Sequence, residues 1–241
     1  MSSRSDPVRR AELLSALGNL RRRIVDAAAM AGRDPYSITL VAVTKTFPVE
    51  DARTLLDLGV YDLGESRDQQ ARGKAAELGE YPGGRLRWHF IGRVQTNKAR
   101  SIASYASAVH SVDRPQVALA LDDAVGQLER PPLEVFVQAS LDGDPERGGA
   151  LERDLAGLAD LVASRPHLRL AGLMAVAPMS MDPRAAFARL AEFSATLVSQ
   201  HPQASGMSAG MSGDFEAAIA AGSTHLRVGS ALLGRRSPDF G

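Results

Sequence analysis

A lysine stands at the point where the chain leaves a strongly apolar segment. Lys45 directly follows the sequence ITLVAVT, which has the composition of a buried strand. An ammonium group at the end of such a strand is partly desolvated, and desolvation favours the neutral amine. Because a neutral lysine amine forms Schiff bases with aldehydes and ketones, Lys45 is a candidate nucleophile. A lysine that simply turns from the strand into solvent is the alternative explanation of the same position.

The first of two candidate anion-binding segments is SGMSAGMSGD, residues 205–214. Its small residues precede a predicted helix, so backbone N–H groups can approach an anion there and the helix dipole adds a positive field. The hydroxyls of Ser208 and Ser212 supply further donors. An ordinary helix start capped by Ser212 or Asp214 explains the same residues.

The second segment, HLRVGSALLG, covers residues 225–234. It predicts a strand that carries Arg227, followed by a helix that begins at Gly229 and Ser230. Neither segment by itself is a specific indication of an anion-binding site. Taken together with Lys45, the two segments describe a site for a phosphorylated aldehyde, with an amine for the carbonyl and small residues for the phosphate.

Several other chemistries are poorly supported. The chain has no cysteine, which excludes disulfides, zinc–thiolate centres, iron–sulfur clusters and thiol nucleophiles. The histidines, at positions 89, 110, 167, 201 and 225, show no metal-ligand spacing, so we expect no catalytic metal. We expect no serine hydrolase site, because nothing in the sequence pairs a serine with a placed histidine. His89, within the segment WHFIG, fits either a position at the mouth of a site or a half-buried structural role.

Composition places the chain among ordinary globular proteins. It has 241 residues, with 28 basic and 28 acidic residues, and this neutral balance argues against a dedicated nucleic-acid-binding protein. No apolar run approaches the ~18 residues of a membrane span, and the first residues lack the apolar core of a signal peptide. We therefore expect a cytoplasmic protein with one domain over residues 1–241, an N-terminal helix at about 7–31 and a loose tail at about 235–241.

Short apolar segments alternate with helical segments along the chain, which is typical of parallel βα units. A domain of this size built from eight such units is most simply a (β/α)8 barrel, here with an additional N-terminal helix. The alternative, an open doubly wound sheet, requires a glycine-rich turn after the first strand, and VTKTFP contains no glycine. The predicted strands are residues 38–43, 60–63, 87–91, 108–112, 133–138, 170–176, 204–208 and 225–228, and the helices between them begin near Val49, Ser66, Thr96, Pro115, Gly149, Pro183 and Ser212.

The barrel prediction brings the candidate residues together. In this fold the functional site lies at the carboxyl ends of the strands, and the loops after the seventh and eighth strands commonly bind phosphate. Lys45 follows the first predicted strand, and the two candidate anion-binding segments follow the seventh and the eighth. We therefore expect all three to face one site at the mouth of the barrel.

Segments spread over nearly the whole chain also resemble a known family. They are LVAVTKT, LGES, WHFIGRVQTNK, VHSVDR, GLMAVAP, MSAGMSGD and LRVGSALLG. The chain is similar to the pyridoxal phosphate homeostasis proteins, which are related to the barrel domain of alanine racemase. The most specific of the matching segments is WHFIGRVQTNK, at residues 88–98.

The resemblance implies a barrel that binds pyridoxal 5′-phosphate (PLP) as a Schiff base on Lys45. It places Arg227 near the pyridine nitrogen of the cofactor. It also implies phosphate contacts near Ser208, Gly210, Gly229 and Ser230.

Three departures from the family pattern bear on this expectation. Ser66 stands where the family usually has asparagine, and its shorter side chain puts a hydrogen bond to the cofactor ring in question. Arg147 stands where a lysine is often found, and arginine keeps the charge but forms no Schiff base. Met207 and Ala209 replace the usual leucine and methionine, which we interpret as a change in packing.

The resemblance implies a cofactor carrier rather than an enzyme, with no catalytic residue assigned. An arginine at the pyridine nitrogen weakens the ring as an electron sink. Alanine racemases use a second base, a tyrosine from another domain, whereas we expect no second domain here, and the tyrosines at 36, 61, 81 and 105 lie outside the family motifs. We therefore expect a monomer that stores and delivers PLP, contacts PLP-free enzymes transiently and binds neither nucleic acid nor membrane. The alternatives are a weak PLP-dependent amino-acid racemase and a PLP-independent Schiff-base lyase.

Overall fold

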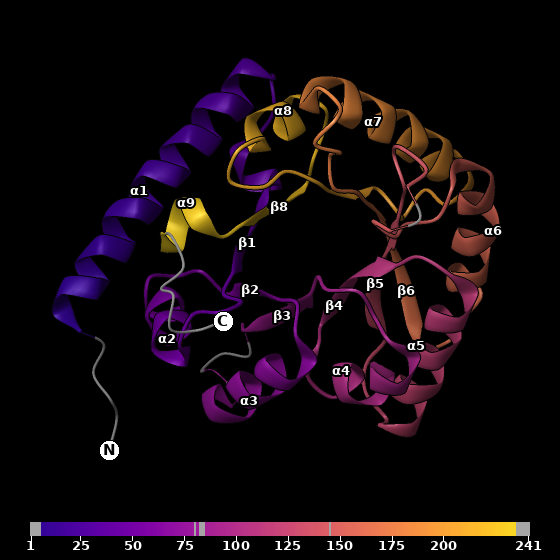
Figure 1. Ribbon diagram of the computed structural model, residues 1–241, viewed down its shortest axis with the longest axis horizontal. Helices are drawn as coiled ribbons and strands as arrows, with labels where there is room; N and C mark the ends of the chain where they lie inside the picture. Colours follow the sequence, from indigo (N-terminus) through magenta and orange to yellow (C-terminus); the bar gives the residue numbers. More distant parts are fainter. Residues whose placement is uncertain (1–5, 80, 82–84, 145, 235–241) are drawn as a thin grey trace.

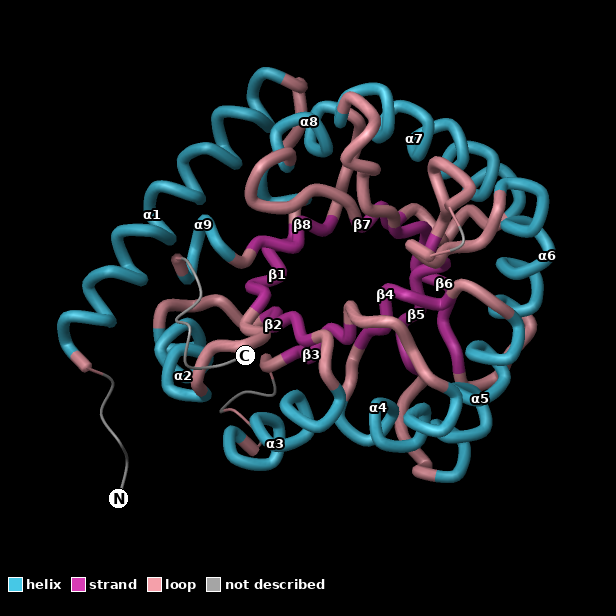
Figure 2. Tube along the Cα trace, viewed as in Figure 1, coloured by secondary structure: helices cyan, strands magenta, loops and turns pink. Residues whose placement is uncertain are grey.

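Eight parallel strands close into a barrel in sequence order, and helices surround it (Figures 1 and 2). The computed structural model describes residues 6–79, 81, 85–144 and 146–234. The closed order confirms the predicted (β/α)8 barrel with an N-terminal helix and excludes the open sheet. The tail expected at about 235–241 lies outside the described residues.

The strands are short and largely buried, as parallel strands covered by helices must be. They are β1 (Thr39–Val43), β2 (Asp62–Glu65), β3 (Arg87–Phe90), β4 (Ala108–Val112), β5 (Leu133–Gln138), β6 (Leu168–Met174), β7 (Gly206–Ser208) and β8 (His225–Val228). Two strands are shifted by two residues from the predicted ranges: β6 begins and ends earlier than 170–176, and β2 begins and ends later than 60–63. The shift of β2 has a clear cause. The glycine and acidic residues of β2 have low intrinsic strand preference, but pairing of Leu63 with Trp88 on β3 overrides that preference.

Helices follow the strands around the outside of the barrel (Figure 2). They are α1 (Pro7–Met30), α2 (Val49–Asp57), α3 (Asp68–Leu78), α4 (Ala99–Tyr105), α5 (Pro115–Gln127), α6 (Glu152–Ala163), α7 (Pro183–Gln200), α8 (Phe215–Ala220) and α9 (Ser230–Leu233), with two 3-10 turns at Pro35–Ser37 and Thr96–Lys98. None of the helices in the described part of the chain combines the length and apolarity needed to cross a membrane.

The additional helix α1 packs along the outside of the barrel against α8, α9 and α2 (Figure 1). The carboxylate of Asp6 caps its first turn by accepting from the N–H of Val8. Its apolar face is buried, with Leu13, Leu17, Leu20, Ile24, Ala27 and Ala28 in the core. Arg9 adds a bidentate pair with Asp51 of α2, at 3.0 and 2.8 Å. This helix therefore ties the closing βα unit to the beginning of the barrel.

Polar and aromatic side chains occupy the barrel interior, where branched aliphatic residues are usual. His110 on β4 stacks on Phe136 of β5 with ring centroids 4.5 Å apart, and His225 on β8 lies 5.0 Å from the same ring. Burial lowers the pKa of His225 to about 4 and the pKa of His110 well below its usual value. His89 on β3 is fully buried, so the structure supports a structural position for it and not one at the mouth.

Candidate functional site

A pocket of about 610 Å³ lies at the carboxyl ends of β1 and β8. Its size falls within the ~300–1,000 Å³ typical of small-molecule sites. The pocket is lined by Val43, Lys45, Phe47, Ile91, Met211, Ser212, Gly213, Arg227, Gly229, Ser230 and Gly234. Five residues singled out from the sequence therefore meet in one place: Lys45, Ser212, Arg227, Gly229 and Ser230.

A strained turn positions Lys45 at the end of β1. Thr44 is fully buried, and Lys45 itself is half-buried where the chain turns toward α2. The next residue, Thr46, has φ +68°, a conformation that β-branched residues rarely adopt. The hydroxyl of Thr46 is also buried and has no hydrogen-bond partner among the described residues. Backbone strain of this kind concentrates at functional sites, which supports a functional role for the turn that carries Lys45.

Arg227 brings a buried positive charge to the pocket. Its side chain on β8 donates to the hydroxyl of Ser208 at 2.6 Å and to the carbonyl of Ala175 at 2.9 Å. Both acceptors are neutral, and Arg227 takes part in no ion pair within the described chain, although the more distant carboxylate of Asp214 still acts on it. Burial lowers the pKa of Arg227 to about 10, so the guanidinium remains charged at pH 7. A buried cation with neutral partners is suited to an anionic or electron-rich atom of a ligand.

Small residues form the part of the pocket between β7 and α9. Ser212 and Gly213 come from the loop after β7, whereas Gly229 and Ser230 lie at the start of α9. The two segments are joined because the N–H of Ala231 donates to the hydroxyl of Ser212 at 3.1 Å. Their short side chains leave backbone groups accessible, which is the arrangement that phosphate groups require.

Three of the residues proposed from the family resemblance do not line this pocket. Ser208 is fully buried, and its hydroxyl is engaged by Arg227 and His110. Gly210 packs beneath α8, where an added Cβ would lie 2.7 Å from Ala218. Ser66 packs against the loop after β3, since a Cβ on Gly92 would lie 2.1 Å from its carbonyl oxygen. The structure thus places Ser208 behind Arg227, and Ser212 is the serine of this loop that lines the pocket.

The remaining lining residues were not identified from the sequence as site residues. Phe47, Ile91 and Met211 are apolar and carry no chemical signature of their own. These residues follow β1, β3 and β7 within a few positions. They could have been predicted from the rule that functional sites of such barrels lie at the carboxyl ends of the strands. Met207 and Ala209 are buried, in agreement with their interpretation as packing residues.

No second base or second lysine reaches the pocket from the described residues. None of the residues that line it is a tyrosine. Tyr36 is exposed, Tyr61 and Tyr81 contact each other, and Tyr105 donates to Asp68. Arg147 is exposed as well, with its guanidinium 3.4 Å from Asp142 and donating to the carbonyl of Val176.

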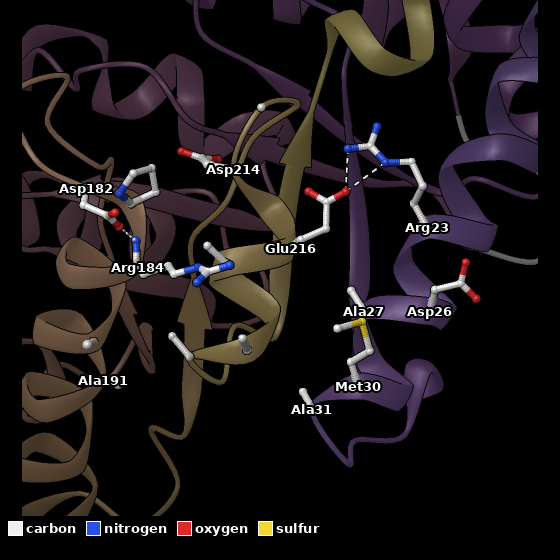
Figure 3. A pocket seen from close by; sticks show the side chains of 16 residues that line it. Arg23, Asp26, Ala27, Met30, Ala31, Asp182, Arg184, Ala191, Asp214 and Glu216 are labelled. Carbon is white, nitrogen blue, oxygen red and sulfur yellow. Dashed lines mark hydrogen bonds and ion pairs between the residues drawn. The ribbon is translucent and has the colours of Figure 1, made fainter.

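A larger groove of about 1020 Å³ lies between α1, α7 and α8 (Figure 3). Arg23 pairs with Glu216 across this groove at 2.5 Å, and Asp182 caps α7 by accepting from the backbone N–H of Arg184. Alanine side chains form much of its wall. The groove reaches Gly213, which also lines the smaller pocket, but it contains no buried cation and no lysine. The smaller pocket is therefore the better candidate for a reactive ligand.

Comparison with known proteins gives consistent matches over this fold. The family described as alanine racemase, N-terminal domain, matches residues 16–237. A pyridoxal phosphate homeostasis protein of Mycobacterium leprae is 42% identical over 241 residues, covering 94% of this chain and 93% of that protein. The protein of the same name from Pseudomonas aeruginosa is 42% identical over 228 residues, covering 93% and 95%. The structure of PipY from Synechococcus elongatus with PLP bound superposes with a TM-score of 0.80 at 32% identity, covering 92% of this chain and 100% of that one.

Proposed function

Because this chain belongs to the family of pyridoxal phosphate homeostasis proteins, which share the N-terminal domain of alanine racemase, we propose that it binds PLP covalently through Lys45 and holds it for delivery. One observation carries the proposal: Lys45 shares a pocket of about 610 Å³ with the buried cation Arg227 and with the small residues Gly229 and Ser230. The PLP-bound structure of the relative PipY supports the choice of ligand.

The residues of the pocket fit the chemical groups of this cofactor. PLP supplies an aldehyde, which condenses with an amine to a Schiff base with loss of water, together with a pyridine ring and a phosphate. Lys45 provides the amine. Ser212, Gly213, Gly229 and Ser230 provide short side chains and backbone N–H groups for the phosphate. Arg227 provides a donor for the ring nitrogen, and Phe47 and Ile91 provide apolar surface for the ring.

The same residues disfavour turnover. A guanidinium at the ring nitrogen opposes protonation of the ring, so a carbanion formed on a bound amino acid would be poorly stabilised. Racemisation also needs a base on each face of the substrate, and among the described lining residues only Lys45 can act as one. We therefore propose a carrier that passes PLP to PLP-free enzymes in transient encounters, since no described lining residue pairs with Lys45 as a second base. As expected from the sequence, we propose a monomeric and cytoplasmic protein.

Solvent exchange at the α-carbon of L-alanine distinguishes a protein that only holds PLP from one that catalyses a reaction on an amino acid. We expect the PLP-loaded protein in deuterated water to exchange this proton no faster than free PLP at the same concentration, as followed by proton NMR. Sustained exchange that Lys45→Ala abolishes would establish the racemase alternative instead. A colourless protein that borohydride traps only when a keto or aldehyde substrate is present would establish the lyase.

A further inference from the structure

A continuous chain of hydrogen bonds crosses the barrel interior behind the pocket. The carboxylate of Asp62, at the amino end of β2, lies 2.8 Å from Nε2 of His89. Nδ1 of His89 lies 2.8 Å from Nε2 of His110, and Nδ1 of His110 lies 2.8 Å from the hydroxyl of Ser208. Ser208 in turn accepts from Arg227 at 2.6 Å. We call Asp62, His89, His110 and Ser208 the relay.

The charges at its two ends determine where the protons of the relay lie. Arg227 only donates, so Ser208 accepts from it and its own O–H is available to donate to Nδ1 of His110. His110 is neutral because burial lowers its pKa, and it therefore carries its proton on Nε2 and donates to His89. His89 then donates through Nε2 to Asp62, which as a carboxylate only accepts. All four hydrogen bonds point from the cation toward the anion.

The reverse order of protons conflicts with the same contacts. If His110 donated to Ser208, His89 would have to donate from Nδ1 to His110. A neutral His89 would then turn the lone pair of Nε2 toward the carboxylate of Asp62. Protonating both nitrogens of His89 removes that conflict and pairs the ring with Asp62 at 2.8 Å. It then requires His110 to carry its proton on Nδ1, which the tautomer measurement below distinguishes.

Packing around the relay leaves its rings little room to rotate. His110 stacks on Phe136 with an interplanar angle of 23°, and both His89 and His110 are fully buried. The guanidinium of Arg227 is held by two acceptors, the carbonyl of Ala175 and the hydroxyl of Ser208. The carbonyl is fixed by the backbone, whereas the orientation of the hydroxyl depends on the relay.

We propose that Asp62, His89 and His110 are positioning residues for Arg227: they fix Ser208 as its acceptor and thereby hold the guanidinium at the wall of the pocket. The relay is a property of the PLP-free protein. Its effect on ligand binding rests on the function proposed above.

Asp62→Asn tests the direction in which the hydrogen bonds of the relay point, because asparagine has nearly the same shape as aspartate. A carboxamide can donate as well as accept, so both directions of the relay become populated. When His110 donates to Ser208, the hydroxyl accepts from two donors and becomes a weaker acceptor for Arg227. Glu134→Gln is the matched control. Glu134 is also partly buried and pairs with the same residue as Asp62, Arg87, but it lies outside the relay.

The first readout is the tautomeric state of the histidines in the PLP-free protein, measured by nitrogen-15 NMR at pH 7. We expect His89 and His110 to carry their protons on Nε2 in the wild type and in Glu134→Gln, and His110 to show a mixed state in Asp62→Asn. A wild-type His110 protonated on Nδ1 would overturn the proposal, and this result needs no variant to fold. An unchanged His110 in folded Asp62→Asn would overturn it as well.

The second readout is PLP binding. We expect Asp62→Asn to raise the Kd for PLP about 3- to 10-fold, the size expected for one weakened hydrogen bond to a charged group. The effect should vanish in a Ser208→Ala background, because Asp62 acts through Ser208. Unchanged binding in Asp62→Asn despite altered tautomers would overturn the positioning role. A failure of PLP to bind through Lys45 would overturn the proposed function and leave the tautomer result standing, so the two failures are distinguishable.

Discussion

Lys45→Ala is expected to give a folded barrel that no longer bonds covalently to PLP. The half-buried side chain of Lys45 contributes little to the core, whereas it carries the one side-chain amine among the described lining residues of the pocket. We expect the near-visible absorption of the loaded protein to disappear. The Kd for PLP should rise roughly 100-fold or more, equivalent to about 2.8 kcal/mol, because contacts to the ring and phosphate remain while the covalent bond is lost.

The other two lysines provide controls for this variant. Nζ of Lys74 lies 2.6 Å from the carboxylate of Glu65 and 2.7 Å from the carbonyl of Thr44, so it is held in a buried ion pair. Lys98 is exposed on the 3-10 turn at Thr96–Lys98. Lys98→Ala should therefore bind PLP like the wild type. If Lys45→Ala kept the covalent PLP, the assignment of the amine would be wrong.

Gly210→Ala is expected to destabilise the fold by about 2–5 kcal/mol. Gly210 has φ +90°, and an L-residue in a left-handed conformation costs about 1–2 kcal/mol. The added Cβ would also lie 2.7 Å from Cβ of Ala218 and 2.9 Å from Cα of Phe215, and such overpacking costs about 1–3 kcal/mol. Urea denaturation of the PLP-free protein measures the loss directly.

Gly213→Ala is the control for Gly210→Ala, because it changes a glycine of the same loop that lines the pocket without packing against α8. Gly213 lines the pocket, but a Cβ added there meets nothing within 4 Å. We expect its free energy of unfolding to stay within ~0.5 kcal/mol of the wild type, as for a surface substitution away from special features. A Gly210→Ala protein with wild-type stability and impaired PLP binding would show instead that Gly210 contacts the ligand.

The sequence was sufficient to predict the barrel and the meeting of the main candidate residues at its mouth. Eight βα alternations leave few topologies, and a closed parallel barrel brings all strand ends to one mouth. Lys45, Arg227, Gly229 and Ser230 follow or end strands that are neighbours in the barrel, so their meeting in one pocket followed from strand order alone.

Two parts of the site depend on geometry that a sequence does not contain. Whether Ser208 or Ser212 faces the ligand depends on how the loop after β7 turns, and Gly210 turns it with a positive φ. The contact between His110 and Ser208 joins β4 to β7 across the interior, over 98 residues of sequence. Each histidine by itself has the appearance of an ordinary core residue, and the relay becomes visible only when the barrel is closed.

The most direct test of the covalent role of Lys45 is borohydride reduction of the PLP-loaded wild type, followed by proteolysis and mass spectrometry of the peptides. The chain has three lysines, Lys45, Lys74 and Lys98, so each possible attachment site falls in a distinguishable peptide. We expect pyridoxyl mass on the peptide that contains Lys45 and on neither of the peptides that contain the other two lysines. Label on the Lys74 or Lys98 peptide, or no label at all, would contradict it.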